Sequence, residues 1–201
     1  VYSLSDENEF SISYNAKADR DTLVNMTNHA YFNLKGHNSG NISNHRVMIN
    51  ADRFTAVDIC SVPTGEFIDV MESPFDFRLM KEIDEDIDAD NEQIKFGKGY
   101  DHNWVLNTKG NIRKKACEVY EPESGRMMEV YTTKPGVQLY TGNYLNGAVR
   151  GKDSCYYQKR DGLCLETQYF PNAINIKNFP SPVLTAGDVY NHKTIYKFMI
   201  K

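Results

Sequence analysis

The sequence contains 201 residues, of which 40% are hydrophobic and 25% are charged, as is typical of a soluble globular protein. Its formal net charge of −4 argues against a nucleic-acid or membrane-surface partner, because both bind through a basic surface. No apolar stretch approaches the roughly 20 residues that span a bilayer, so an integral membrane protein is also excluded.

The predicted elements are mostly strands. Polar and apolar residues alternate over residues 1–4, as though the sequence starts inside a strand, and again over residues 9–14. Further β-rich runs cover residues 115–120, 126–132, 137–145 and 194–200. Because residues 121–125 contain Pro122 and Gly125, both suited to turns, we predict that the first two of these runs form a hairpin.

A helical pattern is found only over residues 78–87, where three apolar residues recur at four-residue steps. The acidic run 84–90 does not fit the ligand spacing of an EF-hand, so a solvated acidic loop is the better interpretation. We therefore expect a mainly β protein, a large antiparallel β-sandwich with long functional loops, forming one domain over residues 1–201.

Four cysteines are present, and they form neither a CxxC pair nor a regular framework: Cys60, Cys117, Cys155 and Cys164. This spacing favours reduced, mostly buried thiols, with disulfides as the alternative. Because reduced thiols suit the cytosol, we expect a cytoplasmic protein; a signal peptide before the first residue is the alternative.

The first of three unusually polar stretches covers residues 25–36 and places amides, a Thr and His29 beside two aromatic residues. One interpretation is a turn whose Asn and Thr side chains bind loose backbone groups, with His29 satisfied and buried. The other is that His29 is a proton donor, since the ordinary pKa of histidine, roughly 6.5, allows both protonation states near neutrality.

The second stretch, residues 99–104, places Asp101 and His102 between aromatic residues. Carboxylates accept hydrogen bonds from sugar hydroxyls and aromatic faces cover sugar C–H patches, so this stretch suits polyol recognition. A turn beside a packing Trp104 is the alternative. A metal site is disfavoured because no second spaced ligand pair is nearby.

The third stretch, residues 162–173, places Glu166 within an apolar strand. If its side chain faces inward, burial will raise its pKa towards the working range of a general base. If it faces outward, the run is an ordinary amphipathic strand. Spacing alone leaves both orientations open.

Four long motifs resemble the aldose 1-epimerase (galactose mutarotase) family in order as well as in type. They are NMTNHAYFNLKG at 25–36, GYDHNW at 99–104, PGVQLYTGNYL at 135–145 and LCLETQYFPNAIN at 163–175, and residues 179–190 are similar too. The resemblance implies a galactose mutarotase-like supersandwich, incomplete in this chain. It also implies a cofactor-free isomerase of hexose metabolism that interconverts α and β anomers.

The resemblance further implies roles for five residues. Glu166 matches the general base that takes the proton of the anomeric hydroxyl, and His29 matches the general acid that protonates the ring oxygen. Asp101 matches a hydroxyl-binding carboxylate, while Gln138 and Tyr31 match positions that contact the sugar. No metal and no cofactor is implied, and the expected partner is a small-molecule hexose.

Other functions remain open at this point. A hexose-6-phosphate 1-epimerase would need a basic cluster, but Lys35 and Arg150 are isolated. A glycosidase using Asp101 and Glu166 would leave His29 without a role. A non-catalytic carbohydrate-binding protein on the same scaffold is the alternative from a different class.

Two departures from the family pattern matter. Family members carry an N-terminal portion, with a further active-site His and Arg, before the segment that matches Val1. The chain is therefore expected to be the C-terminal part of such a domain, either a fragment or a naturally short protein. Its exposed inner surface favours a homodimer or pairing with an N-terminal segment. The second departure is Asn172, which stands where the family usually has Asp.

Overall fold

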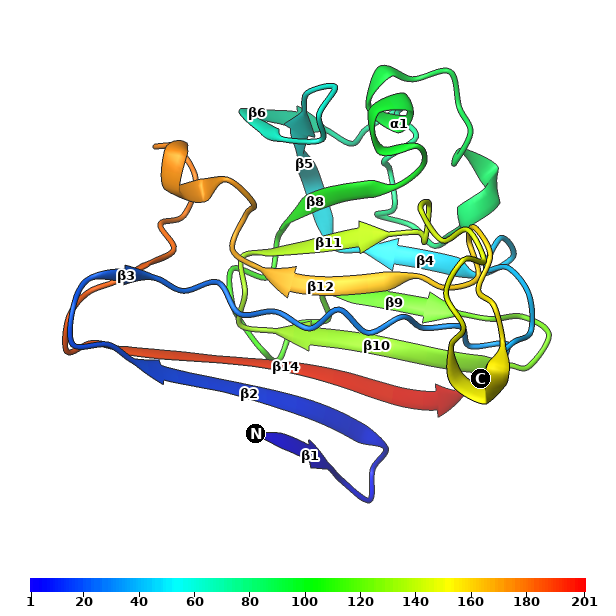
Figure 1. Ribbon diagram of the computed structural model, residues 1–201, viewed down its shortest axis with the longest axis horizontal. Helices are drawn as coiled ribbons and strands as arrows, with labels where there is room; N and C mark the ends of the chain where they lie inside the picture. The colour runs from blue at the N-terminus through cyan, green and yellow to red at the C-terminus, as the bar shows by residue number, and fades with distance from the viewer.

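A computed structural model describes residues 1–201, and most of its regular structure is antiparallel strand (Figure 1). The larger sheet has seven strands and places the N-terminal hairpin at one edge. In order across the sheet, its strands are β1 (Tyr2–Leu4), β2 (Glu9–Lys17), β14 (Val189–Ile200), β10 (Arg126–Thr132), β9 (Cys117–Tyr120), β4 (Arg46–Ile49) and β7 (Lys81–Glu82).

A second sheet of five strands carries the polar motifs at 99–104 and 163–175. In order, its strands are β12 (Cys164–Gln168), β11 (Gly136–Tyr140), β8 (Asp101–Leu106), β5 (Ala51–Val57) and β6 (Pro63–Asp69). A short ribbon pairs β3 (Thr22–Leu23) with β13 (Val183–Leu184). All strand pairs are antiparallel, which confirms the predicted fold class.

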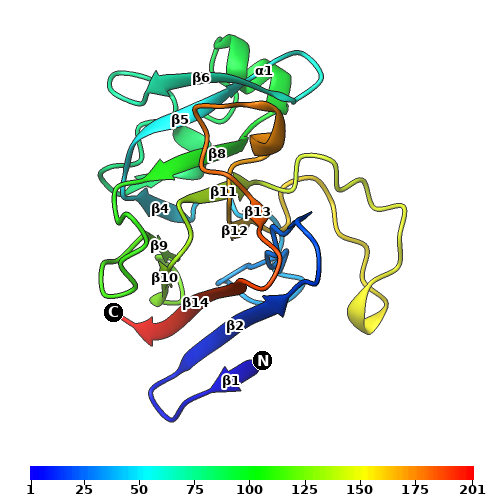
Figure 2. The same ribbon diagram turned by 90° about the vertical axis from the view of Figure 1, so that its left-hand side faces the viewer.

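The two large sheets pack against each other through one apolar core, and Figure 2 shows β5, β6 and β8 above β10, β14 and β2. Trp104 of β8 and Leu139 of β11 meet this core from one sheet, and Val130 of β10 meets it from the other; all three are fully buried. Burying each such side chain contributes about 1.5–3 kcal/mol. The hydroxyl of Tyr196 on β14 also donates to the Leu165 carbonyl of β12 at 2.9 Å, which fixes the sheets' relative position.

The predicted strands are found, with adjusted ends. β9 and β10 form the predicted hairpin, and Gly125 has the positive φ of +70° that its turn requires. β11 ends at Tyr140 rather than at residue 145, because Gly142 turns the chain with φ +65°. β14 begins earlier than predicted, at Val189, because it pairs along its length with β2.

The predicted helix over residues 78–87 is wrong. This region forms β7 and a single 3₁₀ turn, η1 (Ile83–Glu85). Ile83 and Ile87 are fully buried but Leu79 is 83% exposed, so the four-residue spacing does not mark one helical face. The only α-helix is α1 (Glu92–Gly97), whose first turn is capped by the Asn91 side chain.

Two further 3₁₀ turns, η2 (Lys152–Ser154) and η3 (Ala173–Asn175), lie in connecting loops. No helix has the length and apolar character needed to cross a bilayer. All four cysteines are free thiols; Cys117 and Cys164 are buried, whereas Cys60 is exposed and Cys155 is half-buried.

The acidic run at 84–90 lies in η1 and the loop after it, and three of its five carboxylates are paired with basic side chains. Lys81 binds Asp86 at 2.7 Å, and the Arg160 guanidinium binds the carboxylate of Asp88 through two hydrogen bonds. Lys95 forms an ion pair with Asp90. These three acidic residues therefore form ion pairs that hold the loop in place.

Candidate active site

A cavity of about 360 Å³ lies on the face of the five-stranded sheet opposite to the core. This volume falls within the roughly 300–1,000 Å³ of small-molecule sites. All five residues named from the sequence line it. The complete lining is His29, Tyr31, Asp101, Gln138, Tyr140, Tyr144, Glu166, Gln168 and Pro171.

Strand register brings the polar side chains of this lining together. Gln138 of β11 lies opposite Glu166 of β12, and Asp101 of β8 lies opposite Tyr140 of β11. Because side chains alternate along a strand, Gln168 faces the same side as Glu166. Three adjacent strands therefore form a rigid polar floor for the cavity.

Glu166 faces the cavity, which resolves the orientation that the sequence left open. Its side chain is only 12% exposed. Burial raises the pKa of the Glu166 carboxyl; the neighbouring His29 opposes this shift, and the negative charge of Asp101 adds to it. A carboxylate whose pKa is raised accepts a proton more readily, as a general base must.

Residues 25–32, here called the His29 segment, run antiparallel along the free edge of β12 (Figure 1). Asn25 exchanges two hydrogen bonds with the Tyr169 backbone: its amide nitrogen donates to the carbonyl at 3.0 Å, and its amide oxygen accepts from the N–H at 2.9 Å. The Thr27 hydroxyl donates to the Thr167 carbonyl at 2.9 Å. Side chains thus take the place of backbone partners at this sheet edge.

The other end of the His29 segment is fixed by an antiparallel bridge between Phe32 and Leu163, with backbone N···O distances of 2.7 and 2.9 Å. Between these attachments His29 projects over the cavity, with 52% of its side chain exposed. The expected bonding of the Asn25 and Thr27 side chains to backbone groups is therefore found, but in an extended segment and not in a turn. The interpretation of His29 as a satisfied buried histidine is wrong.

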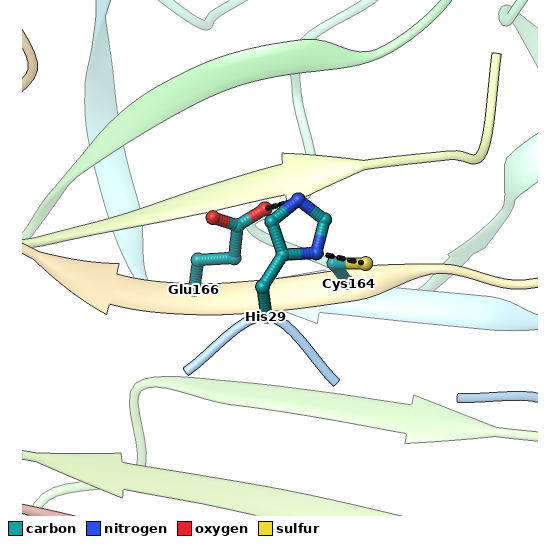
Figure 3. A group of neighbouring side chains, drawn as sticks. All are labelled: His29, Cys164 and Glu166. Carbon is teal, nitrogen blue, oxygen red and sulfur yellow. Dashed lines mark hydrogen bonds and ion pairs between the residues drawn. The ribbon is translucent and has the colours of Figure 1, made fainter. Parts of the chain in front are cut away.

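The imidazole of His29 lies directly beside the carboxylate of Glu166 (Figure 3). Its Nε2 is 3.4 Å from Glu166 Oε1. The ring is also flanked by aromatic residues: its centroid is 5.2 Å from that of Tyr31 and 6.1 Å from that of Tyr140. One proton donor and one proton acceptor are therefore adjacent at the same cavity wall.

The other ring nitrogen of His29 contacts a thiol: Nδ1 lies 3.4 Å from Cys164 Sγ. Donor atoms of His29, Cys164 and Glu166 lie within 4.8 Å of one another, a spacing that a metal ion can bridge. However, Cys164 and Glu166 face different nitrogens of one ring (Figure 3). The three donors therefore do not converge on one point, and this arrangement does not fit a metal centre.

A chain of side-chain hydrogen bonds crosses the cavity floor. Gln168 Nε2 donates to Gln138 Oε1 at 3.2 Å, and Gln138 Nε2 donates to Asp101 Oδ1 at 2.8 Å. Burial raises the pKa of the Asp101 carboxyl, while the hydrogen bond from Gln138 and the charge of His29 act in the opposite direction. This chain offers carboxylate and amide groups to a polyol.

The motif at 99–104 contributes only Asp101 to the cavity. Tyr100, His102 and Trp104 are fully buried, and burial lowers the pKa of His102 to about 3. Asn103 is buried as well, with no hydrogen-bond partner for its side-chain amide. The prediction that the aromatic residues of this motif form a recognition surface is therefore wrong. The alternative, in which Trp104 packs in the core, is correct.

Sequence reasoning missed four lining residues: Gln168, Tyr140, Tyr144 and Pro171. Gln168 follows Glu166 by two positions, so strand alternation was a usable signal for it. The tyrosines lie in the motif at 135–145, but nothing local distinguishes them from core aromatics.

Asn172 does not line the cavity. It adopts the left-handed conformation with φ 62°, which Asn tolerates better than most residues. Its side chain donates to the Pro63 carbonyl at 3.0 Å and accepts from Asn175 at 2.7 Å. The bond to Pro63 connects the turn after β12 to β6.

Comparisons with known proteins identify the family of this chain. The model of the aldose 1-epimerase family matches residues 1–197. The chain is 44% identical over 201 residues to the galactose mutarotase of Bos taurus, covering all of this chain and 56% of that protein. It is 39% identical to the aldose 1-epimerase of Escherichia coli, covering 98% of this chain and 57% of that protein.

A crystal structure of an aldose epimerase homologue from C. elegans superposes with a TM-score of 0.88 at 30% identity, covering 99% of this chain and 58% of that one. A galactose 1-epimerase from Lactobacillus acidophilus gives a TM-score of 0.84 at 27% identity, with coverages of 99% and 55%. The chain spans little more than half the length of these curated and solved relatives. By the match of its sequence and its fold, the chain belongs to the aldose 1-epimerase family.

Proposed function

We propose that this chain carries the acid–base pair of an aldose 1-epimerase, which interconverts the α and β anomers of free hexoses such as galactose and glucose. The observation that carries the proposal is the 3.4 Å contact between Glu166 and His29 at the wall of the cavity. Mutarotation is open to both acid and base catalysis. A base and an acid that lie next to each other are the catalytic groups that this reaction needs.

In the proposed reaction, the Glu166 carboxylate removes the proton of the anomeric hydroxyl while His29 delivers a proton to the ring oxygen. The bond between C1 and the ring oxygen breaks, giving the open-chain aldehyde. Rotation about the C1–C2 bond presents the other carbonyl face, and closure returns both protons. Each group contributes about 10²–10⁴-fold, or ~3–5 kcal/mol.

The short distance between the two groups suits this chemistry. The anomeric oxygen and the ring oxygen are bonded to the same carbon, so their proton acceptor and proton donor must also be neighbours. The lateral contact of Glu166 Oε1 with His29 Nε2 supports the pairing.

We assign sugar binding to Asp101, Gln138 and Tyr31. Asp101 and Gln138 already share a hydrogen bond and can accept and donate to vicinal hydroxyls. The half-exposed ring of Tyr31 is available to cover sugar C–H groups. No Lys or Arg lines the cavity, which favours free hexoses over hexose phosphates.

We further propose that the cavity is completed by additional protein, either the N-terminal portion typical of the family or a second copy of this chain. Half of the His29 side chain is exposed, and a second cavity of about 670 Å³ beside the His29 segment has apolar walls that include Phe32 and Phe198. Strand β1 also exposes Tyr2 and Leu4. We place the protein in the cytoplasm, because its free thiols suit a reducing compartment.

The test is polarimetry of freshly dissolved α-galactose with the full-length natural protein. We expect acceleration over buffer, and a loss of about 10²–10⁴-fold in kcat for His29→Gln. His37→Gln is the matched control, since His37 lies outside the site cavity and contacts Tyr157. An unaccelerated reaction with measurable sugar binding would favour the non-catalytic carbohydrate-binding alternative.

A further inference from the structure

Behind the imidazole of His29 lies the thiol of Cys164, which none of the proposed steps uses. We propose that Cys164 is a positioning residue that holds the His29 ring, so that Nε2 is the nitrogen that exchanges protons in the cavity. The inference deepens the proposed function and rests on it, since it concerns how the acid is oriented.

The contact geometry selects one ring orientation. Glu166 faces Nε2 at 3.4 Å and Cys164 Sγ faces Nδ1 at 3.4 Å, at two different corners of the ring (Figure 3). A half-turn of the ring would place carbon atoms where the nitrogens now lie and would lose both contacts. Because this terminal torsion of histidine is otherwise broad, the two contacts together define the reactive orientation.

Strand spacing explains why both partners reach the same ring. Cys164 and Glu166 are two residues apart on β12, so their side chains point to the same face. At roughly 3.3 Å per residue, their positions are about 6.6 Å apart along the strand. An imidazole fits between groups at this spacing with one polar contact at each side.

The thiol remains protonated, which makes it a hydrogen-bonding partner and not a nucleophile. Burial raises the pKa of Cys164, and the carboxylates of Glu166 and Asp101 raise it further. The side chain is fully buried. It does not line the cavity, so it acts on His29 without contact with the sugar.

A thiol suits both protonation states of the ring. When the resting neutral ring carries its proton on Nε2, towards the carboxylate, the S–H group donates to Nδ1. When the ring is doubly protonated and acts as the acid, Nδ1–H donates to the sulfur instead. After Nε2 has given its proton to the ring oxygen, the neutral ring keeps the proton on Nδ1 and the same bond to sulfur remains, so the contact persists while Nε2 loses and regains its proton. An alanine at this position would provide neither interaction.

The kinetic test compares Cys164→Ala with Cys164→Ser. We expect Cys164→Ala to lower kcat by about three- to tenfold, the range of one weak hydrogen bond, with KM unchanged because the thiol does not contact the sugar. Cys164→Ser, whose hydroxyl both donates and accepts, should restore most of kcat. Cys117→Ala is the control, because Cys117 is an equally buried thiol on β9 outside the cavity.

A spectroscopic test uses the S–H stretching band in the infrared spectrum of the same protein. The band that Cys164→Ala removes should lie at lower frequency than that of Cys117, and His29→Phe should move it to higher frequency. An unmoved band, an unchanged kcat in Cys164→Ala, or an equal loss in Cys164→Ser would each overturn the inference. Because the band is independent of turnover, an inactive wild-type protein would contradict the proposed function and leave this test decisive.

Discussion

The two faces of the five-stranded sheet have opposite chemistry although the same strands build them. On β8, Asp101 faces the cavity and Trp104 faces the core; on β12, Glu166 faces the cavity and Leu165 faces the core. Cavity-facing side chains bind one another through hydrogen bonds and carry charge. Core-facing ones are mostly apolar; the exceptions include His102, which burial keeps neutral, and Thr167, whose hydroxyl pairs with that of Thr194 in the opposite sheet.

The cavity face of these strands carries the proposed catalytic groups, and the core face of the same strands stabilises the fold. The raised pKa values of Glu166 and Asp101 mean that the folded state disfavours their charged forms, so above these pKa values both carboxylates reduce the free energy of unfolding. The apolar face of the same strands supplies the compensating stability. Substitutions on the cavity face should therefore lower activity, whereas those on the core face should lower the free energy of unfolding, and this difference can be tested.

The largest expected effect is on the cavity face. Glu166→Gln is nearly isosteric but cannot take a proton, so kcat should fall by about 10²–10⁴-fold. Sugar binding, measured by calorimetry, should persist because Asp101 and Gln138 are unchanged. Glu118→Gln provides the control: Glu118 is a buried carboxylate on β9, outside the cavity. Normal turnover in Glu166→Gln would remove this residue from the mechanism.

On the core face, the largest loss should come from Trp104→Ala. Trp104 is fully buried among Phe54, Phe75 and Phe77, and its indole N–H donates to the Phe75 carbonyl at 3.1 Å. We expect the free energy of unfolding, measured by urea denaturation, to fall by about 3–5 kcal/mol. Tyr31→Ala on the cavity face should leave it nearly unchanged. Equal losses in the two variants would contradict the separation of the faces.

Sequence patterns predicted the strands of the molecule better than they predicted the contacts on the cavity face. Alternation is local, so it identified β2, β10 and the hairpin, and the family resemblance named five residues that share one cavity. Register is set by contacts between distant segments, so neither the Gln168–Gln138–Asp101 chain nor the inward orientation of Glu166 followed from spacing. The short α1 was missed because six residues do not establish a helical period.

A smaller effect is expected where the His29 segment meets β12. Asn25→Ala removes two hydrogen bonds to Tyr169, so His29 should be held less firmly and kcat should fall by about five- to tenfold. Hydrogen exchange of the Tyr169 amide, which donates to Asn25, should quicken in the variant. Asn28→Ala in the same segment is the control, since Asn28 makes no side-chain hydrogen bond; a similar loss of kcat there would contradict the role of Asn25.

The smallest effect is a displacement of the acidic limb of the pH profile. In the proposed mechanism Glu166 acts as the ionised base, so kcat should fall as the pH drops through its pKa, which lies above the ordinary value of 4.5. Asp101 contributes to that rise through its negative charge. Asp101→Asn removes the charge, so the pKa of Glu166 should decrease and the acidic limb should move to lower pH.

The shift is measured as kcat at saturating galactose, because Asp101→Asn should also raise KM by removing a hydroxyl acceptor. Asp90→Asn is the control, since Asp90 is an exposed carboxylate paired with Lys95 outside the cavity. A limb that stays in place in Asp101→Asn would show that burial alone sets the pKa of Glu166. A limb that moves to higher pH would mean that Asp101 stabilises the ionised base, which is the opposite of simple repulsion between two carboxylates.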